Sequence, residues 1–530
     1  LWEMLESVRT QTFGDWELCL VDDRSSAPHV RQVIEEAIAE DPRIRVQWRE
    51  ENGGIVAASN DALAMAQGEF LALLDHDDEL HPDALAHVHE ALLANPEGDY
   101  VYTDEDKIDR RGHHSGPFFK PEWSPERMRT QMYTCHLSVF RRSLVEEVGG
   151  FDPEYEGSQD WDLVLRVTER ARAVLHVPRV LYHWRMIETS AAGGDAKPWA
   201  FEAGRRAIEA HCKRIGLPAR CEQDQVDPGV YHLEPELTEE PLVSIIIPSR
   251  GTVREVRYEP VVLINNCVRS IVERSSYENY EIVCVLDEDT PDDVREYLEE
   301  VDERVRIVDY DRPFNFSAKI NVGAVRSEGE HLLLLNDDIE VATPNWLERM
   351  VMYSAHPGIG AVGGKLLWED GRLQHVGICF ENGLPGHPHY GFSGEFRGYG
   401  NGIRIARNLL AVTGACLMTS RELFEEVGGL SPGFPVNYND VDYCLKLHSR
   451  GQRIVYDPDL VMLHFESSSR STEVEEWEKD LLLDRWAPLT AVDPYSNPNL
   501  HHGSPRISSA LNWAIRRRPN LPKILTRRRG

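Results

Sequence analysis

Residues 329–340 have the sequence Gly-Glu-His-Leu-Leu-Leu-Leu-Asn-Asp-Asp-Ile-Glu, an apolar run that ends abruptly in the neighbouring carboxylates Asp337 and Asp338. Four consecutive leucines predict a short strand that is buried on both faces of a sheet. An ionised carboxylate is costly to bury without a partner, so packing alone does not explain acids at this point. A divalent cation that binds a phosphate group explains them better.

The same plan occurs earlier in the chain, in residues 68–80, with the sequence Gly-Glu-Phe-Leu-Ala-Leu-Leu-Asp-His-Asp-Asp-Glu-Leu. Other matching segments follow in the same order: residues 16–23 with 280–287, 146–151 with 425–430, 158–166 with 438–446, and 180–185 with 461–466. A period of about 260–280 residues is too long for a solenoid and predicts two copies of one domain.

Each copy alternates short apolar strands with helical segments. This pattern predicts an α/β fold, with a Rossmann-like, mostly parallel sheet, helices on both faces and a ligand site at the carboxyl ends of the strands. The first copy has no counterpart of the apolar strand at residues 241–250, and the chain starts without Met inside an apparent helix, so we expect a strand to precede Leu1. We assign the domains as follows: residues 1–215 form the first domain, with its N-terminal strand missing; 216–241 a polar, acidic linker; 242–475 the second domain; and 476–530 a helical extension with a basic tail.

The composition narrows the class of protein. A net charge of −32 argues against nucleic-acid binding. The nine cysteines include no Cys-x-x-Cys pair, which argues against a zinc ribbon and is typical of a reducing, cytoplasmic compartment. Residues 513–529 run against the overall charge, with seven Arg and Lys side chains among apolar ones and no acid. This tail is either a solvated segment or a peripheral contact with the anionic inner face of the plasma membrane.

The acids that follow the apolar strands suit a hard cation. Mg²⁺ or Mn²⁺ binds one or two carboxylates and completes its shell with water and diphosphate oxygens. We predict that Asp338, and Asp77 in the first copy, bind this metal, and that His464 and His183 add imidazole ligands after later strands. The alternatives are a solvated acidic turn and structural histidines.

A second set of recurring residues predicts a nucleotide pocket. Asp287 ends an apolar strand and could accept a hydrogen bond from the ring N–H of a pyrimidine, although a turn-capping role is the common alternative. The spacing from Asn60 to Asp75 equals that from Asn321 to Asn336. The predicted nucleotide-sugar contacts are Asp287, Asp337, Lys319 and Asn321 in the second copy and Asp22, Asp23, Asn60 and Asp75 in the first.

A general base is predicted near the start of a later amphipathic segment. Asp440 and Asp442 lie two residues apart, so their side chains point in different directions and need not share a role. We predict that Asp440 takes the proton from an acceptor hydroxyl. Asp160 is its counterpart in the first copy.

Taken together, these motifs resemble the family 2 glycosyltransferases with the GT-A fold, and in particular bacterial rhamnosyltransferase-like and O-antigen enzymes with two such domains in tandem. The resemblance is carried by residues 244–248, Asp287, 336–338, 439–442 and 464–470, and by residues 102–107, 119–123, 157–160, 413–416 and 493–499. It covers nearly the whole chain except the linker and the basic tail.

The resemblance implies an inverting, metal-dependent transfer of a sugar from a dTDP- or UDP-linked donor to a hydroxyl of a glycan or lipid-linked glycan of the bacterial surface. It assigns the metal to Asp338 and Asp77, the general base to Asp440 and Asp160, and contact with the nucleotide base to Asp287 and Asp23. The single displacement of an inverting enzyme needs one base and no enzyme nucleophile, which agrees with one base candidate per copy.

Two departures leave the role of the first copy open. Asn336 stands where the first copy has Asp75, and the first copy lacks the opening strand. The alternative is that only the second domain is catalytic and that the first binds the acceptor or serves as a scaffold. A nucleotidyltransferase would need a glycine-rich, basic phosphate loop, and a dinucleotide oxidoreductase would need Gly-x-Gly-x-x-Gly, which residues 360–364 lack.

Overall fold

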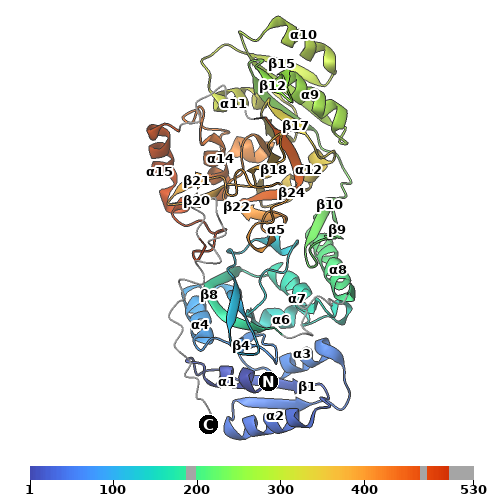
Figure 1. Cartoon of the computed structure of the whole chain (residues 1–530), viewed down its shortest axis with the longest axis vertical. Coiled ribbons are helices and arrows are strands. Elements are labelled where there is room, and N and C mark those ends of the chain that lie inside the picture. The colour runs from blue at the N-terminus through green and yellow to red at the C-terminus, as the bar shows by residue number, and fades with distance from the viewer. Residues whose placement is uncertain (187–197, 466–473, 501–530) are drawn as a thin grey trace.

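The computed structural model describes residues 1–186, 198–465 and 474–500. Two α/β domains follow one another along the longest axis of the molecule, with the first in blue to teal and the second in yellow-green to red (Figure 1). Within these described residues, none of the helices has the length and apolar character needed to cross a bilayer. The basic tail and residues 466–470 of the motif that begins at His464 lie outside the described part of the chain.

The second domain is built on a ten-stranded sheet with the order β15-β14-β11-β16-β23-β18-β24-β17, in which β19 also pairs with β18 and β22 with β24. Its strands are β11 (Val243–Ser249), β14 (Tyr280–Asp287), β15 (Val305–Tyr310), β16 (His331–Leu335), β17 (Ile339–Val341), β18 (Ile359–Leu367), β19 (Leu373–His375), β22 (Arg407–Leu409), β23 (Cys416–Ser420) and β24 (Arg453–His464). The strands β15, β14, β11 and β16 are parallel, as predicted. Beyond β16 the sheet is mixed, because β23 pairs antiparallel with both β16 and β18 and β17 antiparallel with β24.

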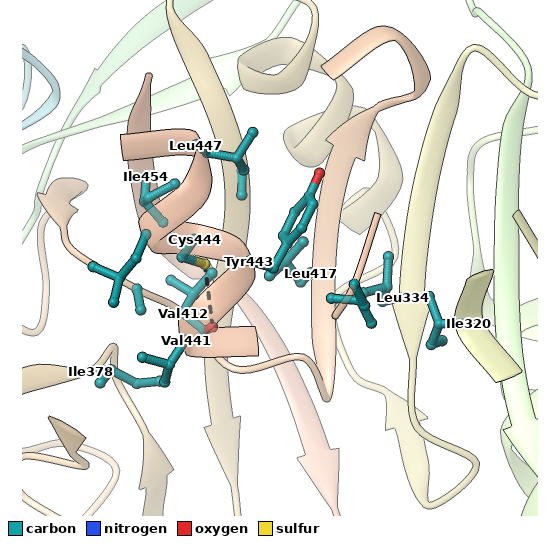
Figure 2. Close-up of a cluster of buried hydrophobic side chains, with 14 of the residues drawn as sticks. Ile320, Leu334, Ile378, Val412, Leu417, Val441, Tyr443, Cys444, Leu447 and Ile454 are labelled. Carbon is teal, nitrogen blue, oxygen red and sulfur yellow. Dashed lines mark hydrogen bonds between the residues drawn. The ribbon is translucent and has the colours of Figure 1, made fainter. Parts of the chain in front are cut away.

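Helices cover both faces of this sheet. They are α9 (Leu263–Arg274), α10 (Asp292–Val301), α11 (Phe316–Arg326), α12 (Trp346–Ser354), α13 (Arg421–Glu426) and α14 (Asn439–His448). Along β16, Leu332 and Leu334 belong to one apolar cluster, whereas Leu333 and Leu335 belong to another. Because side chains alternate along a strand, this division shows that β16 is buried on both faces, as its leucines predict. Figure 2 shows the first cluster, where Tyr443 of α14 lies beside Leu417 of the sheet.

The first domain repeats this plan with its sheet in two pieces. Its strands are β1 (Leu18–Asp22), β2 (Ile44–Trp48), β3 (Phe70–Ala72), β4 (Glu79–Leu80), β5 (Gly98–Ile108), β6 (His114–Phe118), β7 (Ser138–Arg141) and β8 (Ala173–Arg185). Its helices are α1 (Trp2–Arg9), α2 (Pro28–Glu40), α3 (Gly54–Met65), α4 (Ala84–Ala94), α5 (Pro125–Met128), α6 (Arg142–Val148), α7 (Gln159–Thr168) and α8 (Pro198–Ile215), with a 3-10 turn at Pro153–Tyr155. Strands β1 and β2 form one parallel pair, and β3-β7-β5-β8-β4 form a second sheet with β6 on the edge of β5.

The sheet of the first domain is divided at the position that β11 occupies in the second domain. In the second domain β11 lies between β14 and β16 and joins the two halves. Among the described residues of the first domain, no strand takes this place between β1 and β3. As a result every residue of β1 is partly exposed, whereas β14 is largely buried.

The segment expected to be an irregular linker, residues 216–241, instead contains a folded hairpin. It is formed by β9 (Ala219–Gln223) and β10 (Tyr231–Pro235), and Figure 1 shows it in green beside the junction of the domains. Two of its acids are buried rather than solvated, because Asp224 lies 2.7 Å and Asp227 2.8 Å from Arg404 of the second domain. Part of the acidic composition that suggested a linker therefore serves ion pairs across the junction.

The remaining elements belong to the edge of the second domain and to the C-terminal segment. They are the hairpins β12 (Val253–Val256) with β13 (Glu259–Val262) and β20 (Cys379–Glu381) with β21 (Leu384–Gly386), a 3-10 turn at Tyr399–Asn401, and α15 (Glu476–Thr490). After α15 the chain reaches the first domain, where Asn497 Nδ2 donates to Asp104 Oδ2 at 2.9 Å and to the carbonyl of Lys120 at 2.7 Å. An apolar cluster also spans the two domains and contains, for example, Leu165 and Tyr353.

Candidate active site

The carboxyl ends of the parallel strands in the second domain meet at one edge, where Lys319 of α11 connects them. The Lys319 Nζ donates to Asp287 Oδ1 at the end of β14 (2.9 Å) and to the Ser249 carbonyl at the end of β11 (2.8 Å). The Ser249 hydroxyl donates in turn to Asp337, which follows β16. Lys319 is only 1% exposed, so it positions Asp287 from within the protein. Ser249 was not singled out from the sequence, although its position at the end of a buried strand could have indicated it.

Asp338 and His464 form the predicted pair in this domain. His464 ends β24 in register with Ile339, and its Nε2 lies 3.0 Å from Asp338 Oδ1. Its Nδ1 lies 2.5 Å from Gln374 Oε1, an oxygen that can only accept, so Nδ1 carries a proton. The Nε2 therefore faces a carboxylate either as a charged N–H or as a lone pair directed at a cation. One buried carboxylate oxygen and one imidazole nitrogen that converge in this way fit a divalent cation.

A second histidine pair lies beside this site but has a structural explanation. His375 Nε2 accepts hydrogen bonds from the backbone N–H groups of Gly377 and Thr413, so its proton is on Nδ1, which is 3.0 Å from His387 Nδ1. Burial holds the pKa of His375 well below its usual value. His387 follows β21, which ends at Gly386. Within the described residues, neither histidine belongs to a group of three clustered metal-ligand side chains.

Asp440 is held at the first turn of α14. Its two carboxylate oxygens accept from the backbone N–H groups of Gly414 and Val441, each at 2.8 Å. The preceding Tyr438 has a φ of +59°, which turns the chain sharply into the helix. A Cβ atom at position 414 would lie 3.2 Å from the Cβ of Asp440, so glycine allows the turn before β23 to approach. The carboxylate is half-buried and fixed in orientation, as a general base requires.

Asp442 points the other way and has a structural role. It is fully buried and accepts from Trp486 Nε1 (2.9 Å) and Arg485 Nη1 (3.0 Å) of α15 and from the Ser431 hydroxyl (2.6 Å). The two side chains therefore point in different directions and have different partners, as their spacing predicts.

Asn321 and Asn60 bind backbone in the structure. Asn321 Nδ2 donates to the Leu430 carbonyl (2.8 Å) and its Oδ1 accepts from the Leu430 N–H (3.0 Å). Asn60 makes the same two bonds with Phe151, each at 2.9 Å. Their shared spacing therefore has a structural cause, the fixing of a Gly-Gly turn in each domain. We correct the prediction accordingly and leave both asparagines out of the proposed nucleotide site.

In the first domain Asp23 and Asp22 serve turns. Asp23 accepts from the N–H groups of Gly53 and Gly54, each at 2.8 Å, and pairs with Arg49 at 2.9 Å. Asp22 accepts from the Ser25 N–H at 3.2 Å. No lysine of α3 takes the place of Lys319 here, since α3 contains none. In the structure Asp22 and Asp23 therefore have the turn-capping role that was the alternative to base recognition.

Around Asp160 the first domain has its own group of charged residues. His136 Nδ1 lies 3.0 Å from Glu105, and the buried Lys120 lies 3.4 Å from the same carboxylate. Burial raises the pKa of Asp160, while the charge of nearby His136 opposes the rise and that of Asp75 adds to it. His136 was not identified from the sequence, although comparing residues 134–137 with 413–416 places it where the second domain has alanine.

His183 does not take the position of His464. On β5 and β8, Asp104 pairs with Val180 but Glu105 with Tyr182, so Leu181 is skipped. In the second domain Lys365, Leu366 and Leu367 pair with three successive residues, Val461, Met462 and Leu463. The extra residue shifts His183 into the position of Leu463 and Trp184 into that of His464. A shift of one residue turns a side chain to the opposite face of the sheet.

The predicted metal pair of the first domain is therefore not assembled. His183 lies 2.6 Å from Asp106, and Asp77 belongs to neither of the clustered ligand groups among the described residues. The neighbouring Asp78 is buried instead, where it accepts from Tyr182 Oη (2.6 Å) and the Arg185 N–H (2.7 Å). Burial raises the pKa of Asp78 to about 6.

Comparison with known proteins agrees with this architecture. The family model for glycosyl transferase family 2 matches residues 1–149 and 244–428. The chain is 41% identical to the uncharacterized protein y4gI of Sinorhizobium fredii, over 97% of this chain and 57% of that protein. It is 36% identical to the O-antigen biosynthesis protein RfbC of Myxococcus xanthus, over 98% of this chain and 40% of that protein. The chain thus spans about half the length of these relatives.

A solved structure of GalNAc-T7 with UDP, GalNAc and Mn²⁺ is similar over 49% of this chain and 51% of that chain, with a TM-score of 0.38 and 16% identity. The match of the family model to both halves of the chain agrees with the repeat and with the two sheets described above. The chain belongs to glycosyl transferase family 2.

Proposed function

We propose that the second domain transfers a sugar from a nucleotide-diphosphate sugar to a hydroxyl group of a growing bacterial cell-surface polysaccharide, with inversion at the anomeric carbon. The observation that carries this proposal is the fixed Asp440 carboxylate in the same domain as the Asp338–His464 pair and the strand-end Asp287. The relative named for O-antigen biosynthesis supports the class of product.

Each residue has a distinct task in this proposal. Asp287, held by Lys319 and 18% exposed, accepts from the N–H of a uracil or thymine base, which favours a UDP- or dTDP-linked donor. Asp337 contacts the ribose or the sugar. Asp440 takes the proton of the acceptor hydroxyl as that oxygen bonds to the anomeric carbon and the diphosphate leaves.

Asp338 and His464 would hold a divalent cation, Mg²⁺ or Mn²⁺. When bound, the cation supplies positive charge that stabilises the departing diphosphate. Gln374 keeps the His464 ring in the orientation that directs Nε2 toward Asp338.

For the first domain we favour a scaffold or acceptor-binding role over a second transferase site with Asp160 as base. One observation supports this choice: the one-residue bulge turns His183 away from the acids that follow β3. We also propose a cytoplasmic location, with the basic residues 513–529 as a peripheral contact to the inner face of the plasma membrane.

Substitution of the two base candidates tests the proposal. Nucleotide release and sugar transfer are measured with a panel of UDP- and dTDP-sugars and extracted surface glycan as acceptor. Because a general base contributes about 10²–10⁴-fold, Asp440→Asn should lose transfer by that factor. Asp160→Asn, the matched variant, should keep it. Full activity of Asp440→Asn would refute the assignment, and loss of a second linkage in Asp160→Asn would show that the first domain is catalytic.

A further inference from the structure

Three metal-ligand side chains converge on the first domain, on elements that the proposed reaction does not use. They are Asp106 of β5, His114 of β6 and His183 of β8. Asp106 Oδ1 lies 2.6 Å from His183 Nδ1, and Asp106 Oδ2 lies 3.0 Å from His114 Nδ1. One ligand atom from each residue lies within 4.8 Å of the other two. The two imidazole rings contact each other edge to face, with centroids 4.5 Å apart.

The strand registers place this group on one face of the sheet. Asp106 pairs directly with His183 across β5 and β8, and His114 pairs with Ile108, two residues beyond Asp106. Residues two apart on a strand share a face, so all three side chains lie on the same side. Glu105 and Tyr182, one residue earlier, lie on the opposite side, where His136 stacks on Tyr182. The group is thus separated by the sheet from the charged residues around Asp160.

We propose that Asp106, His114 and His183 bind a Zn²⁺ ion. Two imidazoles and one carboxylate favour a transition metal over Mg²⁺, which prefers oxygen ligands. Ligand atoms of a tetrahedral zinc site lie roughly 3.3–3.6 Å apart, as follows from bond lengths of about 2.0–2.2 Å. The two carboxylate–imidazole separations, 2.6 and 3.0 Å, are shorter than this value, so the side chains must move apart by roughly 0.3–1 Å to admit the ion.

The surroundings suit a bound ion with one open position. His183 and Asp106 are largely buried, whereas the His114 side chain is 30% exposed and provides access from solvent. Of the nearby positive charges, Arg185 pairs with Glu3 at 2.9 Å and with Glu79, and Lys107 lies over the Trp184 ring. Because β5, β6 and β8 each supply one ligand, the ion would tie the β6 edge strand to the sheet and stabilise the folded chain.

Zinc binding by the full chain tests this proposal. The chain is prepared metal-free in a non-thiol reductant and in an Asp338→Asn background, which weakens the site in the second domain. Zn²⁺ affinity is measured by competition with a chromophoric chelator, and Co²⁺ is used as a spectroscopic probe of tetrahedral coordination. His114→Ala removes the exposed ligand without opening the core. His113→Ala is the matched control, because His113 is the adjacent exposed residue and pairs with Asp109 instead.

We expect one equivalent of Zn²⁺ to bind and to raise the melting temperature, and His114→Ala to lose at least about 100-fold in affinity. His113→Ala should bind as the background does. Absence of stoichiometric binding, or equal affinity in His114→Ala and the background, would overturn the proposal. His183→Ala, which removes a buried ligand, is a second test and should lose Zn²⁺ affinity in the same way. If His183→Ala does not fold, the result for His114→Ala decides the proposal. None of these outcomes depends on sugar transfer.

Discussion

The Nε2 atom of His464 lies 3.0 Å from Oδ1 of Asp338, although 126 residues separate them in the chain (464 − 338). The pairing of β17 with β24 brings them together, and Gln374 from β19 orients the imidazole ring. The first domain repeats both strands but not this contact. The difference between the domains is therefore one of strand register.

His464→Ala should specifically weaken binding of the divalent cation. Without the imidazole, Asp338 is left to hold the cation with water and diphosphate, so the Mn²⁺ concentration for half-maximal transfer should rise about 10–100-fold. Transfer measured against a Mn²⁺ titration checks this. His356→Ala, which changes a histidine at the domain junction, is the control and should leave the titration unchanged; an unchanged titration in His464→Ala would contradict the assignment.

Lys319→Met should separate donor binding from chemistry. The ammonium group contacts Asp287 and the Ser249 carbonyl, so its loss leaves the Asp287 carboxylate without its buried partner. We expect KM for the donor to rise about 10-fold or more, since removing a hydrogen bond to a charged group costs about 1.5–3 kcal/mol, with a smaller effect on kcat. Steady-state kinetics give both constants. Arg250→Ala is the control, because Arg250 pairs with Asp289 at an exposed position; equal effects of the two variants would argue against a specific role for Lys319.

Asn497→Ala should loosen the contact between the C-terminal segment and the first domain. Asn497 is buried and its amide bonds both oxygens of Asp104 and the Lys120 carbonyl. Asp104 Oδ1 keeps the Lys120 N–H and His176 as partners, but Asp104 Oδ2 and the Lys120 carbonyl lose the Asn497 donor. This loss should cost about 1–3 kcal/mol of unfolding free energy. Urea denaturation measures the loss. Asn497→Asp should cost more, because it places a second carboxylate beside Asp104, and Asn499→Ala, which loses one bond to the Pro178 carbonyl, should cost less.

Asp78 should make stability fall as pH rises from about 4 to about 6. Burial raises its pKa in the folded chain to about 6, above the unfolded value of about 3.9, so the folded state holds the proton more tightly in this window. The stabilisation is fully present below pH 4 and is lost as pH passes 6; a shift of two pKa units corresponds to about 3 kcal/mol. Urea unfolding of the wild type and Asp78→Asn at pH 4.5 and 7.5 tests this.

The difference in unfolding free energy between the two proteins should change in favour of Asp78→Asn as pH rises. Asp77→Asn, at a more exposed neighbouring carboxylate, should follow the wild type. Parallel pH profiles for the wild type and Asp78→Asn would show that Asp78 does not titrate in this range.

The sequence by itself determined the features that depend on local pattern. The run of four leucines placed β16 inside the sheet, the repeat predicted two α/β domains, and the spacing of Asp440 and Asp442 predicted that their side chains point in different directions. These inferences hold because burial and side-chain direction follow directly from the period of a strand or helix.

Tertiary structure decided what depends on register and on partners far along the chain. The bulge at Leu181 that turns His183 toward Asp106, the backbone partners of Asn321, and the hairpin in residues 216–241 leave no local signal in the sequence. A single extra residue in a strand hardly changes the sequence pattern, but it reverses the face of every side chain that follows it. For this reason the sequence predicts a metal-binding histidine in each domain, at His183 and His464. In the structure only His464 contacts the acid that follows the central strand, Asp338 after β16.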